Sequence, residues 1–378
     1  MSSNPQKPAP PVPTGIKKWV FSLIPLLGLL VLAEGFFAEW FYQLHGGHPS
    51  ALLGFGSQVR DLIQGGDGGS EFIQPAPPRG SQELVRFSSD PSPLYRPDPE
   101  LGFGIAPGAY RIKISRGDLE LKFTAHVNER GHRVTSFSDR KDAGQPRVGV
   151  FGDSFVWGWG NEDPVTAPWI LQSLLPQVQV ENYGGNAFGN LHALIQLKGL
   201  AEEKRLPDLV VLFYGFYYDE RNAGSDHFLS LLSLPVFRSE LDLARFTFPR
   251  ARLDAAGKLQ IERLPLLCIS RGDCPPRNPS EEEMDRVTME IFRQIRQTVG
   301  ARPVLLAYVS GVSDQPVLDA AAALQFEVLD LRPRQVFDID NFLPLDPHPG
   351  PRTQMAYARK LHRALQPRLA RLKTPSAS

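Results

Sequence analysis

The sequence predicts an α/β fold in which a mainly parallel central sheet carries helices on both faces. Over residues 146–372, short apolar runs alternate with amphipathic stretches, and repeated βα units of this kind form helix-covered parallel sheets. Residues 207–214 are the clearest buried strand, because the run is almost entirely apolar. We expect a small antiparallel β segment and an N-terminal transmembrane helix before this domain.

The N-terminal residues predict a tail followed by a membrane anchor. Residues 1–17 are rich in proline, serine and polar side chains, which is typical of disorder. Residues 18–41 form a dense apolar run, with Trp19 and Trp40 placed as interfacial anchors, so we expect one transmembrane helix. Lys7, Lys17 and Lys18 lie before the apolar residues that start at Trp19, and Glu34 lies near the end of the run, so the positive-inside rule keeps the tail cytoplasmic. The expected location is the inner (cytoplasmic) membrane, single-pass, with a periplasmic domain.

Two other interpretations of the apolar run remain open. Its uncharged core is short, as in a cleaved signal peptide, although the polar leader is long for one. A buried helix of a soluble domain is the remaining interpretation.

A stalk and a β segment are expected between the anchor and the main domain. Residues 42–100 are rich in glycine and proline, which favours a loop-like stalk with little regular structure. Within residues 101–145, the stretches 110–115 and 119–124 alternate apolar and polar side chains, as half-buried strands do. This alternation predicts a small antiparallel sheet.

The α/β domain is expected over residues 146–372, with one insertion. Residues 225–279 fit no βα unit and are interpreted as an insertion or cap over the carboxyl edge of the sheet. The expected strands are residues 148–151, 178–182, 207–214, 303–309 and 326–331, and the expected helices are residues 167–175, 191–203, 317–324, 351–372 and one capped by Ser280.

Cys268 and Cys274 are the two cysteines of the chain and lie in a turn-rich stretch. In an exported protein they can close a small disulfide. Two unpaired thiols are the alternative. No further cysteine and no nearby histidine completes a metal ligand set, so no metal site is expected.

Gly152, Asp153 and Ser154 end the first strand of the α/β domain. Ligands bind at the carboxyl edge of open parallel sheets, and glycine permits a sharp turn there. Ser154 then lies near a helix start, where free N–H groups can face a developing oxyanion. The motif alone fits a nucleophile and also fits a plain helix cap.

His348 is the histidine best placed to act as a base for Ser154. It follows the last strand and precedes the last helix, in a loop made rigid by prolines. Asp346 lies two residues earlier, so its carboxylate can reach Nδ1 while Nε2 points outward. A solvent-exposed loop with an aspartate cap is the alternative.

The order of these motifs resembles the SGNH (GDSL-like) hydrolase superfamily over about residues 146–370. Residues 152–155, 182–189 and 346–350 are similar to its first, second and last blocks. The resemblance implies a flavodoxin-like three-layer α/β/α fold and a catalytic set of Ser154, Asp346 and His348. It also implies an oxyanion hole formed by the amides of Ser154 and Ala187, with Ala187 at a position where glycine is usual.

The third block departs from the family pattern. Members carry Gly-x-Asn after the third core strand, and that asparagine side chain donates to the oxyanion. Here Tyr217 or Tyr218 follows Gly215 at this position, and Asn222 can substitute if the loop folds back. Removal of one oxyanion donor lowers rates by about 10²–10³-fold.

We therefore expect an exported, membrane-anchored serine esterase or O-acetyltransferase acting on acyl esters. The resemblance points to a cell-surface or secreted polysaccharide as substrate and to other membrane proteins that modify polysaccharides as partners. Trp157 and Trp159 are expected either to stack on a sugar ring or to pack their loop against the insertion. No cofactor is expected. The net charge is zero, with 41 basic and 41 acidic residues, which argues against nucleic-acid binding.

Two further functions remain open. One is a catalytically silent SGNH-like domain that binds glycan or scaffolds an assembly. The other is a lipid esterase at the membrane face, suggested by apolar residues of the insertion that can equally belong to the core, namely Phe228, Leu229, Leu231 and Leu232.

Overall fold

The structure, a computed structural model, describes residues 86–116, 118–138, 144–232, 244–271, 273–310, 315–332, 342–343 and 346–373. The predicted tail and anchor, residues 1–17 and 18–41, and residues 42–85 of the predicted stalk lie outside this part of the chain. Among the described residues, no helix is both long enough and apolar enough to span a bilayer.

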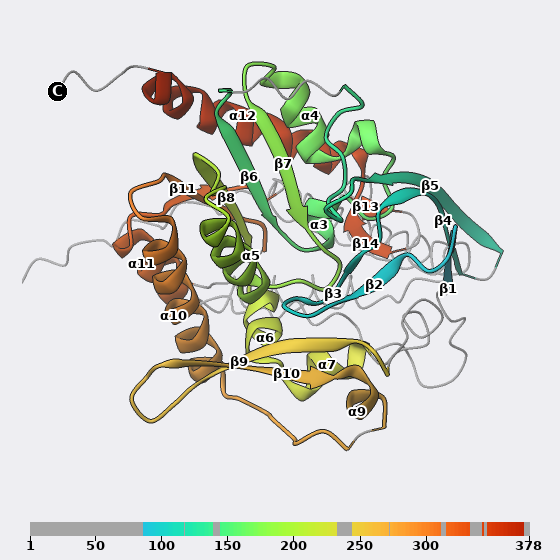
Figure 1. Ribbon diagram of the computed structural model, residues 1–378, viewed down its shortest axis with the longest axis vertical. Coiled ribbons are helices and arrows are strands. Elements are labelled where there is room, and N and C mark those ends of the chain that lie inside the picture. The colour runs from blue at the N-terminus through green and yellow to red at the C-terminus, as the bar shows by residue number, and fades with distance from the viewer. Residues whose placement is uncertain are drawn as a thin grey trace, which may run out of the picture. The chain divides into compact units, whose positions relative to one another are not determined.

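A parallel sheet of five strands forms the centre of the α/β domain (Figure 1). Its order is β12-β11-β8-β6-β7, and every neighbouring pair is parallel. In chain order this is the 2-1-3-4-5 arrangement of flavodoxin-like folds, so the predicted class is confirmed. The strands are β6 (Arg147–Gly152), β7 (Gln179–Gly184), β8 (Leu209–Tyr214), β11 (Val304–Tyr308) and β12 (Glu327–Asp330).

Helices cover both faces of this sheet, which explains why β8 is buried at every position. On one face α4 (Ala167–Leu174) packs against α12 (Pro351–Lys373). On the other face α10 (Glu281–Val299) packs against α5 (Asn190–Glu202) and α11 (Gln315–Ala323). The expected cap of α10 is present, since Ser280 Oγ accepts a hydrogen bond from the Glu283 amide at 3.2 Å.

The antiparallel β segment is present and begins earlier than predicted. Its main sheet has the order β1-β4-β5, formed by β1 (Arg86–Asp90), β4 (Gly108–Arg116) and β5 (Leu119–Val127). Between β1 and β4 in the sequence, β2 (Tyr95–Asp98) and β3 (Gly102–Ile105) form a separate hairpin. The predicted stalk, residues 42–100, is therefore wrong at its C-terminal end, because β1 and β2 fall within it.

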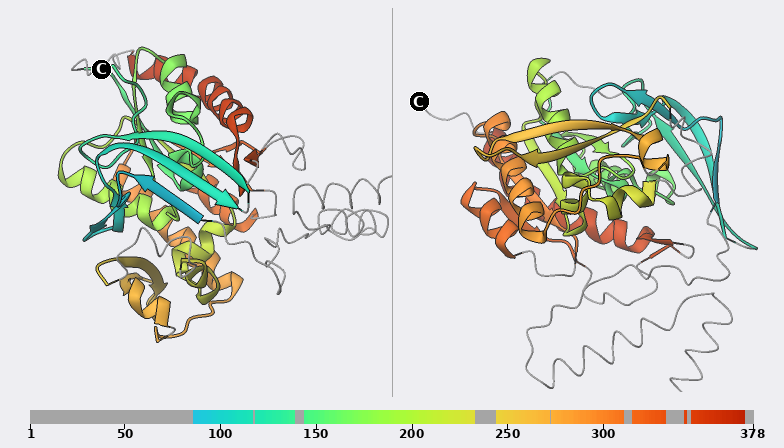
Figure 2. Two further views of the ribbon diagram at one scale, coloured as in Figure 1. Left: turned by 90° about the vertical axis from the view of Figure 1, so that its right-hand side faces the viewer. Right: turned by 90° about the horizontal axis from the view of Figure 1, so that it is seen from below.

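The insertion has secondary structure of its own. The short helix α6 (Tyr217–Ala223) follows β8 and precedes the insertion, whose first helix is α7 (Asp226–Leu232). An antiparallel hairpin, β9 (Thr247–Leu253) and β10 (Leu259–Pro265), leads into α9 (Leu266–Arg271). The hairpin packs against α6 and against β3, so it joins the β segment to the carboxyl side of β8 (Figures 1 and 2).

Two hydrophobic cores result. The larger lies between the parallel sheet and its helices. The second lies between the β segment, the insertion and the loop after β6, and it contains Trp157, Trp159, Phe188 and Phe228. The segment that carries Ser154 thus lies between the two cores, which restricts its movement.

Candidate active site

Ser154 lies at the carboxyl end of β6, as predicted from the sequence. Asp153 caps the short helix α3 (Ser154–Trp157), and its Oδ1 accepts a hydrogen bond from the Phe155 amide at 2.9 Å. Ser154 is the first residue of α3, so its own N–H lies ahead of the intrahelical bonds. The aspartate is the cap, and the serine remains only 6% exposed.

This position is the switch point of the sheet. β6 is flanked by β7 and β8, which connect to it in opposite directions along the sheet. Ligands bind outside the carboxyl ends of the strands at such a point, because the loops there diverge. The fold therefore places Ser154 where a substrate can be held.

His348 lies 2.8 Å from the serine, measured from Nε2 to Ser154 Oγ. The hydroxyl can donate to Nε2 in the tautomer that carries its proton on Nδ1. The imidazole packs edge-on against Phe155 at 5.6 Å between ring centroids. The two residues are 194 apart in the sequence, and the structure brings them into hydrogen-bond contact.

The segment around His348 is a short strand, where the sequence predicted a loop. β14 (Asp346–Pro349) pairs antiparallel with β13 (Phe342–Leu343). The pairing fixes the backbone of the histidine next to α12. Asp346 begins β14, and its side chain lies outside the described part of the structure.

Close packing of β7 against α3 holds the nucleophile in place. A Cβ on Gly184 would lie 2.4 Å from the Trp157 amide nitrogen, so only glycine permits this approach. Asn182 Nδ2 donates to Val156 O at 3.1 Å, and its Oδ1 accepts from the Gly184 amide at 2.9 Å. The second sequence block thus contacts the helix that begins with Ser154.

Ala187 adopts a left-handed backbone conformation, with φ of 64°. This conformation favours glycine, which accounts for the glycine expected at this position. The loop is joined to the first block, because the Gly185 amide donates to Gly152 O at 3.1 Å. The turn therefore accommodates alanine without losing the backbone N–H.

Two of the three proposed side-chain oxyanion donors are engaged elsewhere. The Tyr218 hydroxyl accepts from the Asp153 amide at 3.0 Å, and the residue is 0% exposed. Asn222 Oδ1 accepts from the Leu191 amide at 3.0 Å, and its Nδ2 donates to Thr288 Oγ1 at 2.8 Å. Tyr218 and Asn222 are both 0% exposed, so neither side chain is open to a substrate, which corrects the expectation for both residues.

Tyr217 differs from both. Its hydroxyl is buried and has no hydrogen-bond partner among the described residues. Burial, followed by the nearby Asp153, raises the pKa of Tyr217 well above its ordinary value. The hydroxyl stays protonated, and because it is buried we do not assign it to the oxyanion hole.

Arg221 links the two loops beside Ser154 and was not anticipated from the sequence. Its Nη1 donates to Asp153 Oδ2 at 2.7 Å and to Phe188 O at 3.0 Å. The guanidinium also lies over the Tyr217 ring, 4.6 Å from its centroid. Although burial opposes it, the carboxylate of Asp153 raises the pKa of Arg221, so the guanidinium stays charged.

Trp157 and Trp159 are packing residues. They are 0% and 8% exposed and belong to the second core. The Trp157 indole lies under the Arg133 guanidinium, 4.6 Å from it, and both rings pack near Phe123 of β5. The expectation of sugar stacking does not fit these buried rings, and they pack against the β segment more than against the insertion.

The apolar residues of the insertion are also interior. Phe228, Leu229 and Leu232 are 6%, 3% and 2% exposed, and Leu231 packs against the same core. They do not form a lipid-facing surface, which removes the observation behind the lipid-esterase interpretation. Cys268 and Cys274 are joined by a disulfide in this region.

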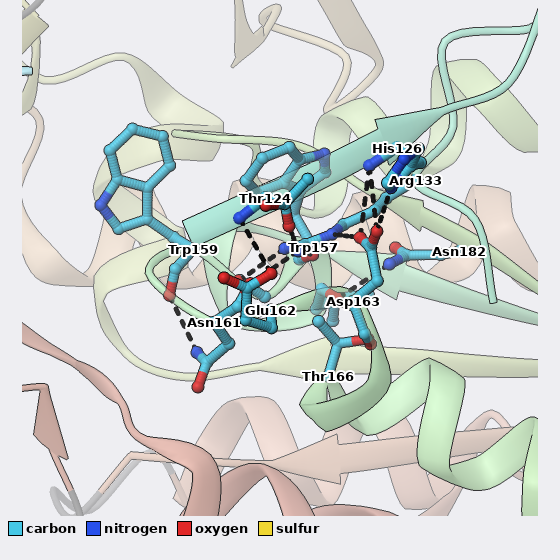
Figure 3. A network of polar contacts seen from close by, with 12 residues as sticks. Thr124, His126, Arg133, Trp157, Trp159, Asn161, Glu162, Asp163, Thr166 and Asn182 are labelled. Atoms are coloured by element: carbon cyan, nitrogen blue, oxygen red, sulfur yellow. Dashed lines mark hydrogen bonds and ion pairs between the residues drawn. The ribbon is translucent and has the colours of Figure 1, made fainter. Parts of the chain in front are cut away.

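A buried polar network holds the loop that follows Ser154 (Figure 3). Arg133 lies at its centre, with an Nε donor to Asp163 Oδ1 at 2.7 Å. His126 Nδ1 lies 2.6 Å from Asp163 Oδ2. Asn161 Nδ2 donates to the carbonyls of Trp159 and Pro349.

Gln354 of α12 makes a second connection to the nucleophile. Its Nε2 donates to Phe155 O at 3.0 Å, and its Oε1 accepts from the Ala167 amide at 2.8 Å. The helix after His348 is thereby joined to the helix that begins with Ser154. Within the described ranges, no group of three or more His, Cys, Asp or Glu side chains is placed to hold a metal ion.

No protein-family model matches the sequence, and a search of curated proteins finds no match. Solved structures do match. A putative lipolytic protein of the G-D-S-L family from Desulfitobacterium hafniense shares 14% identity, covering 58% of this chain and 99% of its own, with a TM-score of 0.34.

Two further solved structures illustrate the range of this likeness. TesA shares 16% identity, with 58% of this chain and 98% of TesA covered and a TM-score of 0.36. A carbohydrate esterase family 2 enzyme from Corynascus thermopiles shares 12% identity, with 77% and 88% covered and a TM-score of 0.36.

Proposed function

We propose that this chain is a serine esterase or O-acyltransferase in which Ser154 is the nucleophile and His348 the general base. The observation that carries the proposal is the 2.8 Å contact between Ser154 Oγ and His348 Nε2 at the switch point of the sheet. Asp346, two residues before the histidine, is assigned the role of orienting the imidazole, on the sequence pattern alone.

The chemistry follows from these roles. Ser154 Oγ attacks the acyl carbonyl and transfers its proton to His348 Nε2. Collapse of the tetrahedral intermediate expels the alcohol, which takes the proton back from the imidazolium. The acyl group on Ser154 then passes to water in an esterase, or to an acceptor hydroxyl in a transferase, with His348 again acting as base.

The oxyanion is assigned to two backbone amides, those of Ser154 and Ala187. No counterpart is assigned to the side-chain donor of related hydrolases, because Tyr218, Asn222 and the Tyr217 hydroxyl are all buried. One missing donor lowers the rate by about 10²–10³-fold relative to a site with three. We therefore expect a slow enzyme.

The substrate and location belong to the same proposal. Residues 18–41 support a single membrane anchor and an exported domain. We propose an acylated polysaccharide as the substrate, on the resemblance of the sequence motifs alone. Trp157 and Trp159 no longer support a glycan substrate, since both are buried. Membrane fractionation of cells followed by alkaline washing tests the anchor, because a spanning helix resists the wash and a peripheral protein is released.

The experiment on activity uses the full-length protein in detergent with an activated acetyl ester. We expect acetate release that disappears in Ser154→Ala. Addition of an oligosaccharide acceptor then separates the two reactions, because transfer produces acetylated sugar and hydrolysis does not. Absence of any Ser154-dependent release or acyl-enzyme rules out both enzymes.

A catalytically silent glycan-binding or scaffold domain is the second candidate. The complete burial of Tyr218 and Asn222 favours it, since neither side chain is open to a bound substrate. A silent domain would bind the oligosaccharide equally well with and without the Ser154 hydroxyl and would release no acetate.

A further inference from the structure

We propose that Asn161 is a positioning residue that sets His348 against Ser154, and that Arg133 of the small β segment fixes the loop in which Asn161 lies. The proposal rests on the proposed function, because it concerns the same serine and histidine. It assigns the β segment to the catalytic unit, where the sequence suggested only a connecting element.

Asn161 bridges the serine loop and the histidine strand with one amide. Its Nδ2 donates to Trp159 O at 3.0 Å and to Pro349 O at 2.9 Å. Trp159 follows α3 in the serine loop, and Pro349 follows His348 directly. Asn161 is 2% exposed, so water does not replace these bonds easily. A shift of β14 relative to α3 breaks one of the two bonds.

Arg133 fixes the path of the loop that carries Asn161. Besides Asp163, its nitrogens donate to Trp157 O at 3.2 Å, Gly158 O at 2.7 Å and Asn161 O at 2.6 Å. A fifth bond runs to Thr124 O of β5 at 3.0 Å. These bonds occupy all five N–H groups of the guanidinium, whose rigid planar form fixes the acceptors in space.

The same loop is attached to the edge of β5 by backbone amides. The Thr124 amide donates to Glu162 Oε2 at 3.0 Å, and the His126 amide donates to Asp163 Oδ2 at 3.2 Å (Figure 3). Backbone N–H groups at the outer edge of β5 are therefore bonded to acidic side chains of the loop. A continuous set of contacts runs from β5 through Arg133 and Asn161 to the residue after His348.

The decisive variant is Asn161→Asp, which keeps the shape of the side chain and removes the N–H donors. Both acceptors are carbonyls, so the new carboxylate repels them and the histidine strand moves away from the serine. With an activated acetyl ester, kcat should fall by about 10- to 100-fold, because misplacement of about 1 Å has effects of this size. KM should change by less than about threefold, since substrate binding groups are untouched.

Gln172→Glu is the matched control. Gln172 Nε2 donates to two backbone carbonyls, Leu175 O at 3.3 Å and Val178 O at 2.9 Å, before β7 begins. Like Asn161→Asp, this substitution replaces an amide that bonds to two backbone carbonyls with an acid, so it should lower the free energy of unfolding. The kcat should stay within about twofold of wild type, because the bonded carbonyls belong to neither the serine loop nor the histidine strand. Urea denaturation of each variant separates loss of folding from loss of turnover.

Asn161→Ala keeps the test valid if the aspartate variant does not fold, because it removes the donors without adding charge. A folded Asn161→Asp or Asn161→Ala protein with wild-type kcat overturns the inference and leaves the proposed function intact. A wild-type protein without Ser154-dependent turnover overturns both. A fall in kcat for Gln172→Glu equal to that for Asn161→Asp also contradicts it, since the effect would then be general loss of structure.

Discussion

Arg221 and Asp153 form a buried ion pair beside the nucleophile, with 2.7 Å between Nη1 and Oδ2. Asp153 is 0% exposed, and the same Nη1 donates to Phe188 O, next to Ala187. One guanidinium thus connects the residue before Ser154 with the loop that supplies the second backbone amide.

Replacement of Arg221 by methionine should lower the free energy of unfolding by about 3–5 kcal/mol, because it leaves the Asp153 carboxylate buried and unpaired. The double variant Arg221→Met with Asp153→Asn should recover part of this loss, since asparagine is neutral and still caps α3. Urea denaturation at neutral pH measures both. Equal losses in the single and double variants would show that the unpaired charge is not the cause.

Tyr217→Phe and Tyr218→Phe form a matched pair of variants that differ only in which hydroxyl is lost. Tyr218→Phe leaves the buried Asp153 amide without its acceptor and should lower the free energy of unfolding by about 1–3 kcal/mol. Tyr217→Phe removes a hydroxyl that has no partner among the described residues, so stability should be unchanged or slightly higher. Its kcat should stay within about threefold of wild type.

A fall in kcat of about 10²-fold or more for Tyr217→Phe would show that this hydroxyl reaches the oxyanion. The hole would then have three donors, and the assignment to two backbone amides would be wrong.

Much of the fold follows from local patterns in the sequence. The parallel strands are continuous apolar runs because helices cover both of their faces, and this signal requires no knowledge of distant contacts. The β9–β10 hairpin was missed because charged residues interrupt its pattern. Arg250 lies within β9 yet is 6% exposed, and it pairs with Glu262 across the hairpin at 3.0 Å. The sequence does not show that the charge of Arg250 is balanced by Glu262, because the two residues meet only when the strands pair.

The residues of the candidate site also fall into two groups, those that the sequence predicts and those that only the structure identifies. Ser154 and His348 lie in short motifs that stand out in the sequence, one after the first strand of the α/β domain and one before the last helix. The order of these two motifs along the chain was enough to predict that the residues act together. Arg133, Asn161 and Arg221 act through backbone carbonyls and a buried carboxylate far along the chain. Asn161 contacts a carbonyl 188 residues away. An ordinary polar residue in a loop gives no local sign of such a contact, so these roles depend on the folded structure.

His192 should make the protein less stable in mild acid. The residue is 1% exposed, and burial, followed by the nearby Arg221, lowers the pKa of His192 from 6.5 to about 3. Below pH 6.5 the unfolded chain binds a proton that the folded chain does not bind until about pH 3, so stability falls through this window. Between pH 7 and pH 4 the loss from this residue should be about 3 kcal/mol.

His192→Asn provides the comparison, because asparagine does not titrate and can accept the Gly189 amide bond that Nδ1 accepts at 3.1 Å. Denaturation curves at both pH values should show a smaller acid loss in the variant. An identical loss in both proteins would mean that His192 does not contribute to acid sensitivity.

The central claim, that Ser154 is a nucleophile activated by His348, is tested most directly by trapping the acyl-enzyme. The full-length protein is mixed with an activated acetyl ester, quenched in acid and digested, and the peptides are analysed by mass spectrometry. We predict one acetyl group on the peptide containing Ser154 in the wild type, none in Ser154→Ala, and a strongly reduced amount in His348→Gln. An unmodified Ser154 peptide in the wild type, or equal acetylation in His348→Gln, would contradict the account.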